Sequence, residues 1–300
     1  MKKLGGKVAL VTGGSRGIGN AVATGLAREG ARIMIAARST GEVLEASDHL
    51  RAMGAEAMSI ATNVADAVQV ERLVNDTIAH FGAIDVLVNA AGVQGPIGPL
   101  WKADPAQWRT ALDINLFGTM LCCRSVVPHM IAAGGGKIIN FGGGGATAPR
   151  MNFSAYAASK AAVVRMTETL AEETRPFNID VNAIAPGIIN TRMLDEIVQA
   201  GSAAGGEPER IEALRKDPAG FVALELPVGL VVFLASQESD GLSGKLISAS
   251  YDDWQAWDQG RIRELSAQPW LTLRRIDQHT LSSITAEGGK ATPGLDSIKA

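Results

Sequence analysis

The sequence has almost no cysteine, no excess of basic residues and no long apolar run. Its only two cysteines, Cys122 and Cys123, are adjacent. Neighbours in sequence rarely form a disulfide, so we expect a reduced, cytoplasmic protein. The formal net charge of −3 implies no basic face, so nucleic acid is not an expected partner. The longest apolar stretch, residues 226–235, includes Pro227 and is about half of what a membrane span needs, so we expect no membrane partner.

Histidine is also scarce, because the chain has four and none stands at a metal-ligand spacing. We therefore expect no metal site. Glycine is abundant, with 34 in 300 residues, and it clusters at a few places that suggest tight backbone sites. Hydrophobic residues make up 46% of the chain, an ordinary globular share that excludes a fully disordered protein.

Short apolar runs rich in β-formers alternate with longer amphipathic stretches. The runs cover residues 8–11, 32–36, 58–61, 86–88, 137–141, 179–184 and 245–248. Helical patterns between them include residues 18–28, 68–81 and 155–173. Continuous apolar strands alternating with helices predict an α/β fold. We expect a Rossmann-like, doubly wound, seven-stranded parallel sheet with helices on both faces.

The domain prediction is one nucleotide-binding domain over residues 1–250 and a C-terminal extension over residues 251–300. A substrate lid is expected at about residues 190–225. One long helix is expected before the fifth strand, from Pro105 to the glycines that begin at Gly134. Three of the five tryptophans follow residue 250, so residues 251–280 should pack on the domain or on a neighbouring subunit. Residues 281–300 are small and polar and should be mobile.

The first apolar run leads into a glycine-rich turn, Thr12-Gly13-Gly14-Ser15-Arg16-Gly17-Ile18-Gly19. A strand, a glycine turn and a helix together form a phosphate cradle. The glycines allow close approach, and the helix N-terminus presents free N–H groups to an anion. On its own, such a turn is weak evidence, because many glycine-rich loops only reverse the chain.

Three further segments accompany the G-x3-G-x-G turn in a fixed order: Asn89-Ala90-Ala91-Gly92, Tyr156-x3-Lys160, and Pro186-Gly187 with Thr191. Over residues 5–250 the chain thus resembles the short-chain dehydrogenase/reductase superfamily, closest in style to its 3-oxoacyl-carrier-protein-reductase-like branch. The resemblance implies a nicotinamide cofactor and a homodimer or homotetramer. The cofactor-binding residues that it implies are Gly13, Ser15, Arg16, Gly17, Ile18, Gly19, Arg38, Asn63, Val64, Asn89, Ala90, Gly92, Tyr156, Lys160, Pro186, Gly187, Ile189 and Thr191.

The end of the second expected strand bears on the choice between NAD and NADP. An acidic side chain there would hold the ribose 2′-hydroxyl and repel a 2′-phosphate. Ala37 stands at that position, and Arg38 follows it. With Arg16 in the glycine turn, two guanidinium groups are available for a phosphate. We therefore predict NADP(H).

Tyr156 and Lys160 share one face of an expected helix, because they are four residues apart. A free phenol has a pKa near 10, which the neighbouring ammonium and the positive nicotinamide ring of the oxidised cofactor can together lower toward neutrality. By the resemblance, Asn115 supports a proton relay through water to Lys160. The expected reaction is reversible hydride transfer between NADP(H) and a small carbonyl or alcohol substrate, with Tyr156 as acid and base.

The serine that this superfamily places thirteen residues before the tyrosine is replaced by Gly143. Three explanations stay open. The enzyme can work without the hydroxyl, with Tyr156 alone or with a backbone N–H of the glycine run as donor. Ser154 or Thr147 can substitute from a shifted loop. Alternatively, the protein can be a catalytically impaired NADP-binding regulatory or partner subunit. If the missing donor limits the rate, Gly143→Ser should raise activity about tenfold or more.

Overall fold

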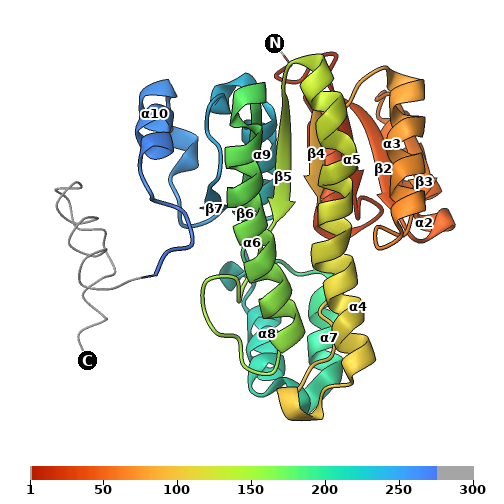
Figure 1. Cartoon of the computed structure of the whole chain (residues 1–300). Coiled ribbons are helices and arrows are strands. Elements are labelled where there is room, and N and C mark those ends of the chain that lie inside the picture. Colours follow the sequence, from red (N-terminus) through yellow and green to blue (C-terminus); the bar gives the residue numbers. More distant parts are fainter. Residues whose placement is uncertain (1, 276–300) are drawn as a thin grey trace.

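The protein is built around one seven-stranded sheet in which every strand is parallel to its neighbours. Figure 1 shows the computed structural model, which describes residues 2–275. The strands are β1 (Val8–Thr12), β2 (Arg32–Ala37), β3 (Ala57–Ala61), β4 (Val86–Asn89), β5 (Gly136–Phe141), β6 (Ile179–Ala185) and β7 (Leu246–Ser248). Their order across the sheet is β3-β2-β1-β4-β5-β6-β7. The predicted fold class is confirmed, because each apolar run became one strand.

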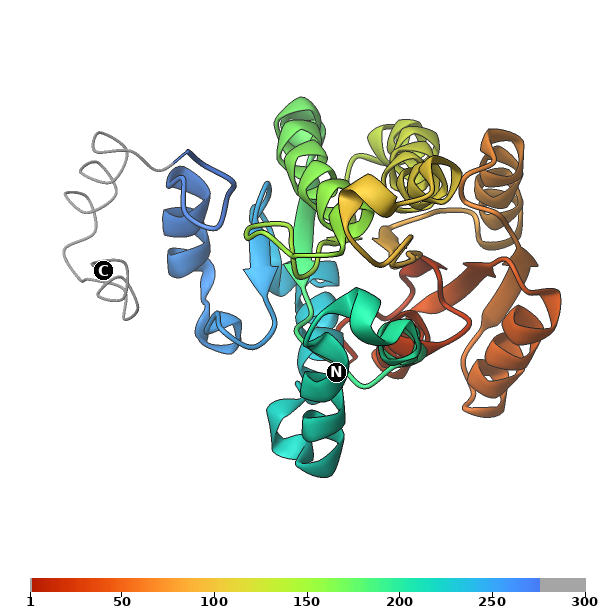
Figure 2. The ribbon, with the colours of Figure 1, turned by 90° about the horizontal axis from the view of Figure 1, so that it is seen from below.

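Helices cover both faces of the sheet (Figure 2). On one face, α1 (Gly17–Arg28), α2 (Thr40–Ala52) and α9 (Glu225–Ala235) contribute Leu26, Leu50 and Leu230 to one apolar core. On the other face, α3 (Ala67–Phe81), α5 (Gly118–Ala133) and α6 (Ser154–Thr174) contribute to a second core that includes Leu73 and Val126. Both faces of the central strands β1 and β4 are therefore buried, which explains why these strands are continuously apolar.

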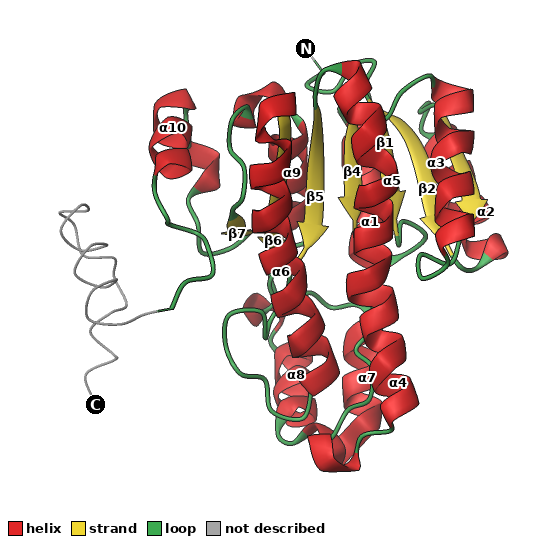
Figure 3. Cartoon of the chain, in the orientation of Figure 1, coloured by secondary structure: helices red, strands yellow, loops and turns green. Residues whose placement is uncertain are grey.

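All seven strands point their carboxyl ends toward the same edge of the sheet (Figure 3). The chain reverses its direction of winding between β1 and β4, which are neighbours in the sheet although β2 and β3 lie between them in sequence. In open parallel sheets, ligands bind in the crevice outside the carboxyl ends at such a switch point. The fold thus locates the candidate site beyond the ends of β1 and β4.

The long helix expected from Pro105 to Ala133 is interrupted. It consists of α4 (Pro105–Leu112), a π-helical turn over Asp113–Phe117, and α5. Asp104 caps the start by accepting a hydrogen bond from the Ala106 N–H, and Gly134 ends α5 in a left-handed conformation. The extra residue of a π turn gives no signal in the apolar pattern, so the sequence did not reveal it. Such turns are frequent at functional sites, and this one contains Asn115.

Between β6 and α9 the chain forms a small helical lid. Its helices are α7 (Arg192–Ala200) and α8 (Glu207–Lys216), with short 3-10 turns at Gly201–Ala204 and Pro218–Gly220. Ile197 of α7 and Ile211 of α8 pack with Phe153 and Tyr156 of the segment around the start of α6. The lid therefore lies at the carboxyl edge of the sheet, where Figure 1 shows α7 and α8 below the strands.

Residues 251–275 follow β7 and lie against the sheet domain. The Trp254 indole is buried and its centroid lies 5.9 Å from that of Phe233 in α9. In the last described helix, α10 (Gln259–Ala267), Ile262 and Leu265 join the same core. The backbone then returns to the sheet, where the Leu246 N–H donates to the Leu271 carbonyl. The expectations for residues 276–280 and 281–300 lie outside the described residues.

Two helical stretches, Pro105–Ala133 and Pro218–Ala235, are long and apolar enough by composition to cross a membrane. In the fold, α5 of the first stretch packs on α3, and α9 of the second packs on α1. A core helix of a soluble α/β domain produces the same apolar signal, so these stretches are weak evidence for a membrane span.

Candidate active site

The glycine turn between β1 and α1 has the geometry of an anion cradle. Gly13 and Gly17 have φ angles of +67° and +56°, which side chains rarely adopt. A Cβ on Gly19 would collide with the Gly13 carbonyl oxygen, so glycine is required there for the helix to start against the turn. The Arg16 side chain does not cap α1. The N–H groups of the first helical turn are therefore available to an anion in the cleft.

A cleft of about 650 Å³ opens beside this turn at the carboxyl edge of the sheet. Most of the residues expected to bind the cofactor line it. They are Gly13, Ser15, Arg16, Gly17, Ile18, Gly19, Arg38, Asn63, Val64, Ala90, Gly92, Tyr156, Lys160, Pro186 and Thr191. Segments that lie far apart in the sequence therefore meet in one cavity.

Three of the expected cofactor-binding residues are not among those that line the cleft: Asn89, Gly187 and Ile189. The Asn89 amide is buried and donates to Asn140 Oδ1 at 2.9 Å, so its side chain is part of a polar network inside the sheet. Gly187, with φ +84°, allows Val222 of the lid to pack directly on the backbone. Ile189 is buried. The Asn89 and Ile189 side chains are therefore packed inside the fold and do not line the cleft.

Glu42 is a cleft residue that our sequence analysis missed. One carboxylate oxygen lies 3.3 Å from Arg16 Nη1 and 3.5 Å from Arg192 Nη1, and the other accepts a hydrogen bond from Ser15. The carboxylate thus links the glycine turn, α2 and the lid. The sequence signal at Glu42 is ambiguous, because a glutamate three residues after Ser39 also fits a helix-capping box.

Tyr156 and Lys160 lie on the buried face of α6 and both reach the cleft. Lys160 Nζ donates to the Phe141 carbonyl at the end of β5 (2.8 Å) and lies 5.8 Å from the Tyr156 ring centroid. Burial lowers the pKa of the Lys160 ammonium to about 8.

The expectation that Lys160 lowers the Tyr156 pKa is not met in the chain as described. Burial raises the pKa of the Tyr156 phenol, and the cation that partly offsets this is the Arg150 guanidinium. Desolvation disfavours the phenolate more than the nearby charges favour it. The phenol is therefore held in its protonated form, as a proton donor requires.

Asn115 is fully buried and serves the site through hydrogen bonds to the backbone. Its Oδ1 accepts from the Val93 N–H at 2.8 Å, and its Nδ2 donates to the Val93 carbonyl and to Ser159 Oγ, both at 2.9 Å. The Ser159 hydroxyl in turn donates to the Tyr156 carbonyl. The π turn thus fastens the Val93 segment to the helix that carries Tyr156. Ser159 was not predicted from the sequence.

Gly143 faces the hydroxyl of Tyr156. A Cβ built on this glycine would lie 2.5 Å from Tyr156 Oη, and its φ of +142° is one that side chains rarely adopt. Ser154 Oγ accepts a hydrogen bond from Trp108 Nε1, and Thr147 is exposed. Within residues 2–275, the amide N–H groups of Gly143, Gly144 and Gly145 donate to no backbone carbonyl. These three N–H groups therefore remain available as hydrogen-bond donors.

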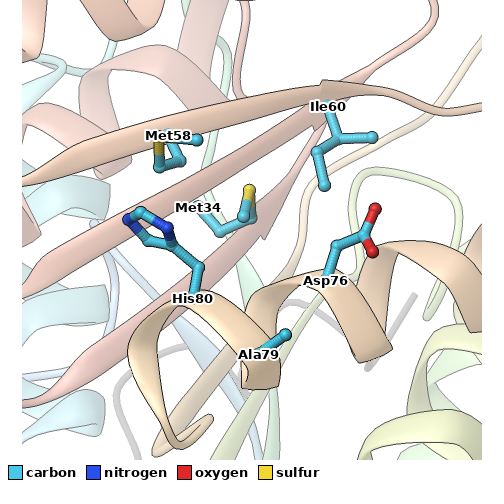
Figure 4. Close-up of a pocket in the computed structure, with 6 residues that line it drawn as sticks. All are labelled: Met34, Met58, Ile60, Asp76, Ala79 and His80. Carbon is cyan, nitrogen blue, oxygen red and sulfur yellow. The ribbon is translucent and has the colours of Figure 1, made fainter.

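A second hollow lies at the edge of the sheet, between β3 and α3 (Figure 4). It is lined by Met34, Met58, Ile60, Asp76, Ala79 and His80. The His80 ring stacks edge-on against Phe81 at 4.5 Å.

Among the described residues, no group of three or more side chains is arranged to hold a metal ion. The cleft beyond β1 and β4 is therefore the candidate active site.

The cradle of free N–H groups, the glycines that leave room against it and the buried lysine fit a dinucleotide with its reactive ring near Tyr156. A model of the short chain dehydrogenase family matches residues 7–201, and the chain belongs to this family. The family uses a nicotinamide cofactor and acts on small molecules that carry a CH–OH group.

Three known proteins show the range of its relatives. The chain is 38% identical over 245 residues to the short-chain reductase protein NovJ of Streptomyces niveus, covering 80% of this chain and 91% of NovJ. It is 32% identical over 243 residues to the 3-oxoacyl-[acyl-carrier-protein] reductase FabG of Staphylococcus aureus. This match covers 80% of this chain and 95% of FabG. The crystal structure of an NAD+-bound xylitol dehydrogenase superposes with a TM-score of 0.77 and 30% identity. The superposition covers 82% of this chain and 98% of the xylitol dehydrogenase chain. The family is thus confirmed, and relatives outside the 3-oxoacyl branch match as well.

Proposed function

We propose that the protein is an NADP(H)-dependent oxidoreductase that interconverts a small ketone or aldehyde and the corresponding alcohol. The observation that carries this proposal is the juxtaposition of the Tyr156 hydroxyl, the Lys160 ammonium and the glycine turn in one cleft. The rival function is a cofactor-binding regulatory or partner subunit with little turnover. Gly143, which provides no hydroxyl beside the phenol, is the observation in its favour.

In this mechanism Tyr156 gives its proton to the carbonyl oxygen as that oxygen becomes an alkoxide. The nicotinamide, when bound, supplies the hydride that the substrate carbon receives. The N–H groups of the turn Gly143–Gly145 take the place of a side-chain donor toward the same oxygen. Lys160, whose Nζ lies 5.8 Å from the Tyr156 ring centroid, would hold the ribose of the bound cofactor. Asn115 acts as a positioning residue, and its relay to Lys160 through water stays a proposal.

The preference for NADP(H) rests on two guanidinium groups and the absence of an acid at Ala37. Arg38 is exposed and lines the cleft, whereas Arg16 is paired with Glu42. A 2′-phosphate beside Arg38 would compete with Glu42 for Arg16. We therefore expect Glu42 to reduce the preference for the phosphorylated cofactor, and Arg38 to create it.

Cofactor affinity tests this balance. Arg38→Ala should weaken NADPH binding about 10- to 100-fold and change NADH binding far less, because one charge-assisted contact to the phosphate is lost. Glu42→Gln should instead strengthen NADPH binding several-fold. Arg72→Ala on α3, which removes an exposed cation on the other face of the sheet, is the matched control. A wild-type Kd for NADH equal to or below that for NADPH would remove the NADP(H) assignment.

We further propose a homodimer or homotetramer in the cytoplasm, with contacts through α5 and α6. Exposed Phe117 and Ile131 at the two ends of the α5 segment favour such a contact. The thiols of Cys122 and Cys123 are buried and free, and burial raises both pKa values, to about 12 for Cys123. Inert thiols of this kind suit a reducing compartment. No nucleic acid and no membrane partner enter the proposal.

The direct test is NADPH consumption with a panel of aldehydes and ketones. The proposal predicts that at least one member of the panel is reduced with stoichiometric loss of NADPH absorbance. Tight NADPH binding with no turnover on any member would favour the regulatory subunit instead.

A further inference from the structure

A second cation, which is partly buried, lies beside Tyr156 and has no role in the mechanism above. Arg150 precedes α6, and its guanidinium carbon lies 3.9 Å from the Phe153 ring centroid and 5.4 Å from that of Tyr156. Its side chain is only 22% exposed. The guanidinium therefore lies near the Tyr156 ring, although Arg150 itself is not one of the residues that line the cleft.

The hydrogen-bonding capacity of this guanidinium is largely unused. Within residues 2–275, its polar partners are Gln94 Oε1 at 3.4 Å and Glu207 Oε2 at 4.0 Å, both at the outer limit of a direct contact. A guanidinium has five N–H donors in a fork that matches a carboxylate. Burying a charge is costly when it lacks close partners, and burial lowers the pKa of Arg150. A partly buried guanidinium without close partners is therefore able to bind an anion.

The surroundings of Arg150 combine a second polar donor with an apolar wall. Gln94 is buried, and its Nε2 makes no hydrogen bond within residues 2–275, so it can donate beside the guanidinium. The lid side chains Ile197, Ile211 and Met193 pack with Phe153 and Tyr156. A molecule with its oxygen at Tyr156 would have its carbon body against the lid and its far end at Arg150.

We propose that the substrate carries a carboxylate, which Arg150 binds with the help of Gln94, so that the enzyme acts on oxo acids and hydroxy acids. Glu207 occupies the guanidinium weakly in the free protein and gives way to the substrate. This proposal rests on the proposed function, because it places the substrate oxygen at Tyr156. It makes Arg150 a specificity-determining residue.

Kinetics with matched substrates test the substrate class. Each of two oxo acids, 4-oxopentanoate and 4-oxocyclohexanecarboxylate, is compared with its methyl ester under NADPH. The wild-type protein should favour the acid in kcat/KM for at least one pair by about 10- to 100-fold, as expected for a charge-assisted contact. Arg150→Met should bring this ratio close to one. Arg210→Met, which removes a more exposed cation that also contacts Glu207, should keep it.

Glu207→Gln separates carboxylate binding from a merely structural role of Arg150. Only carboxylate binding predicts different changes in KM for the acid and for the ester in this variant. With the competing carboxylate neutralised, KM for the acid should fall several-fold, and KM for the ester should not. If acid and ester change equally in Arg150→Met and in Glu207→Gln, Arg150 serves only to hold the lid, and the proposal is overturned.

Binding without turnover separates this proposal from the proposed function. Calorimetry compares cyclohexanecarboxylate with cyclohexanecarboxamide on the full chain. Binding of the acid at least about tenfold tighter, lost in Arg150→Met, supports the carboxylate site even if no ketone is reduced. Equal binding of acid and amide overturns it even if ketones are reduced.

Discussion

Tyr156→Phe is expected to lower kcat for carbonyl reduction by about 10²–10⁴, the usual contribution of a positioned proton donor. The change removes only the hydroxyl. The ring keeps its packing against Phe153 at the start of α6 and against Ile197 and Ile211 of the lid. The Kd for NADPH should change far less than kcat. Steady-state kinetics and fluorescence titration of the cofactor measure the two effects separately.

The only other tyrosine supplies the control, because Tyr251 is 92% exposed and follows β7. Tyr251→Phe should keep the rate of the unmodified protein. A Tyr156→Phe variant that turns over within about threefold of the unmodified protein would show that another group gives the proton.

Gly143→Ser is expected to reduce activity, although the serine that the sequence resemblance implies at this position would by itself suggest a gain. The new Cβ would lie 2.5 Å from Tyr156 Oη, and the backbone has a φ of +142°. The strain should cost about 1–3 kcal/mol of stability. Displacement of the phenol by up to about an ångström should lower kcat/KM about 100-fold.

The neighbouring glycine gives the comparison for this variant. A Cβ at Gly144 meets nothing within 4 Å, so Gly144→Ser adds a hydroxyl to the same turn without touching Tyr156. Its activity should stay close to that of the unmodified protein. A Gly143→Ser protein with activity raised about tenfold or more would show that the turn rearranges and that a missing hydroxyl limits the rate.

The strands could be predicted because burial in the sheet leaves short, continuously apolar runs. Most helices could be predicted because amphipathic stretches lie between these runs. β2, expected at residues 32–36, is observed at Arg32–Ala37, and α3, expected at residues 68–81, is observed at Ala67–Phe81. The caps contribute to this agreement, since Asp66 accepts from the first N–H groups of α3 and Gly82 ends it. Local chemistry and core packing indicate the same boundaries here.

The parts that escaped prediction depend on contacts between distant segments. Glu42 looks like a helix-capping residue, and only the fold brings it to Arg16 and Arg192. Arg150 lies in a loop without periodicity, and its approach to Tyr156 depends on how residues 142–153 fold over α6. The π turn at Asn115 adds one residue to a helix whose apolar pattern continues through it.

Gly143 shows the limit of motif reasoning most clearly. The sequence indicates a missing hydroxyl, but the phenol of Tyr156 lies directly against Gly143, and the N–H groups of this turn donate to no backbone carbonyl within residues 2–275. Whether a donor is lost or replaced depends on a backbone conformation that no residue type specifies.

The central claim is that this cleft transfers hydride to a carbonyl carbon while Tyr156 protonates the oxygen. The most direct measurement supplies NADPH labelled with deuterium at the transferable position of the nicotinamide and analyses the alcohol by mass spectrometry and NMR. Our account predicts one deuterium on the carbinol carbon of the product, with its formation strongly reduced in Tyr156→Phe. Full binding of the labelled cofactor with no deuterium in any product across the ketone panel would contradict it.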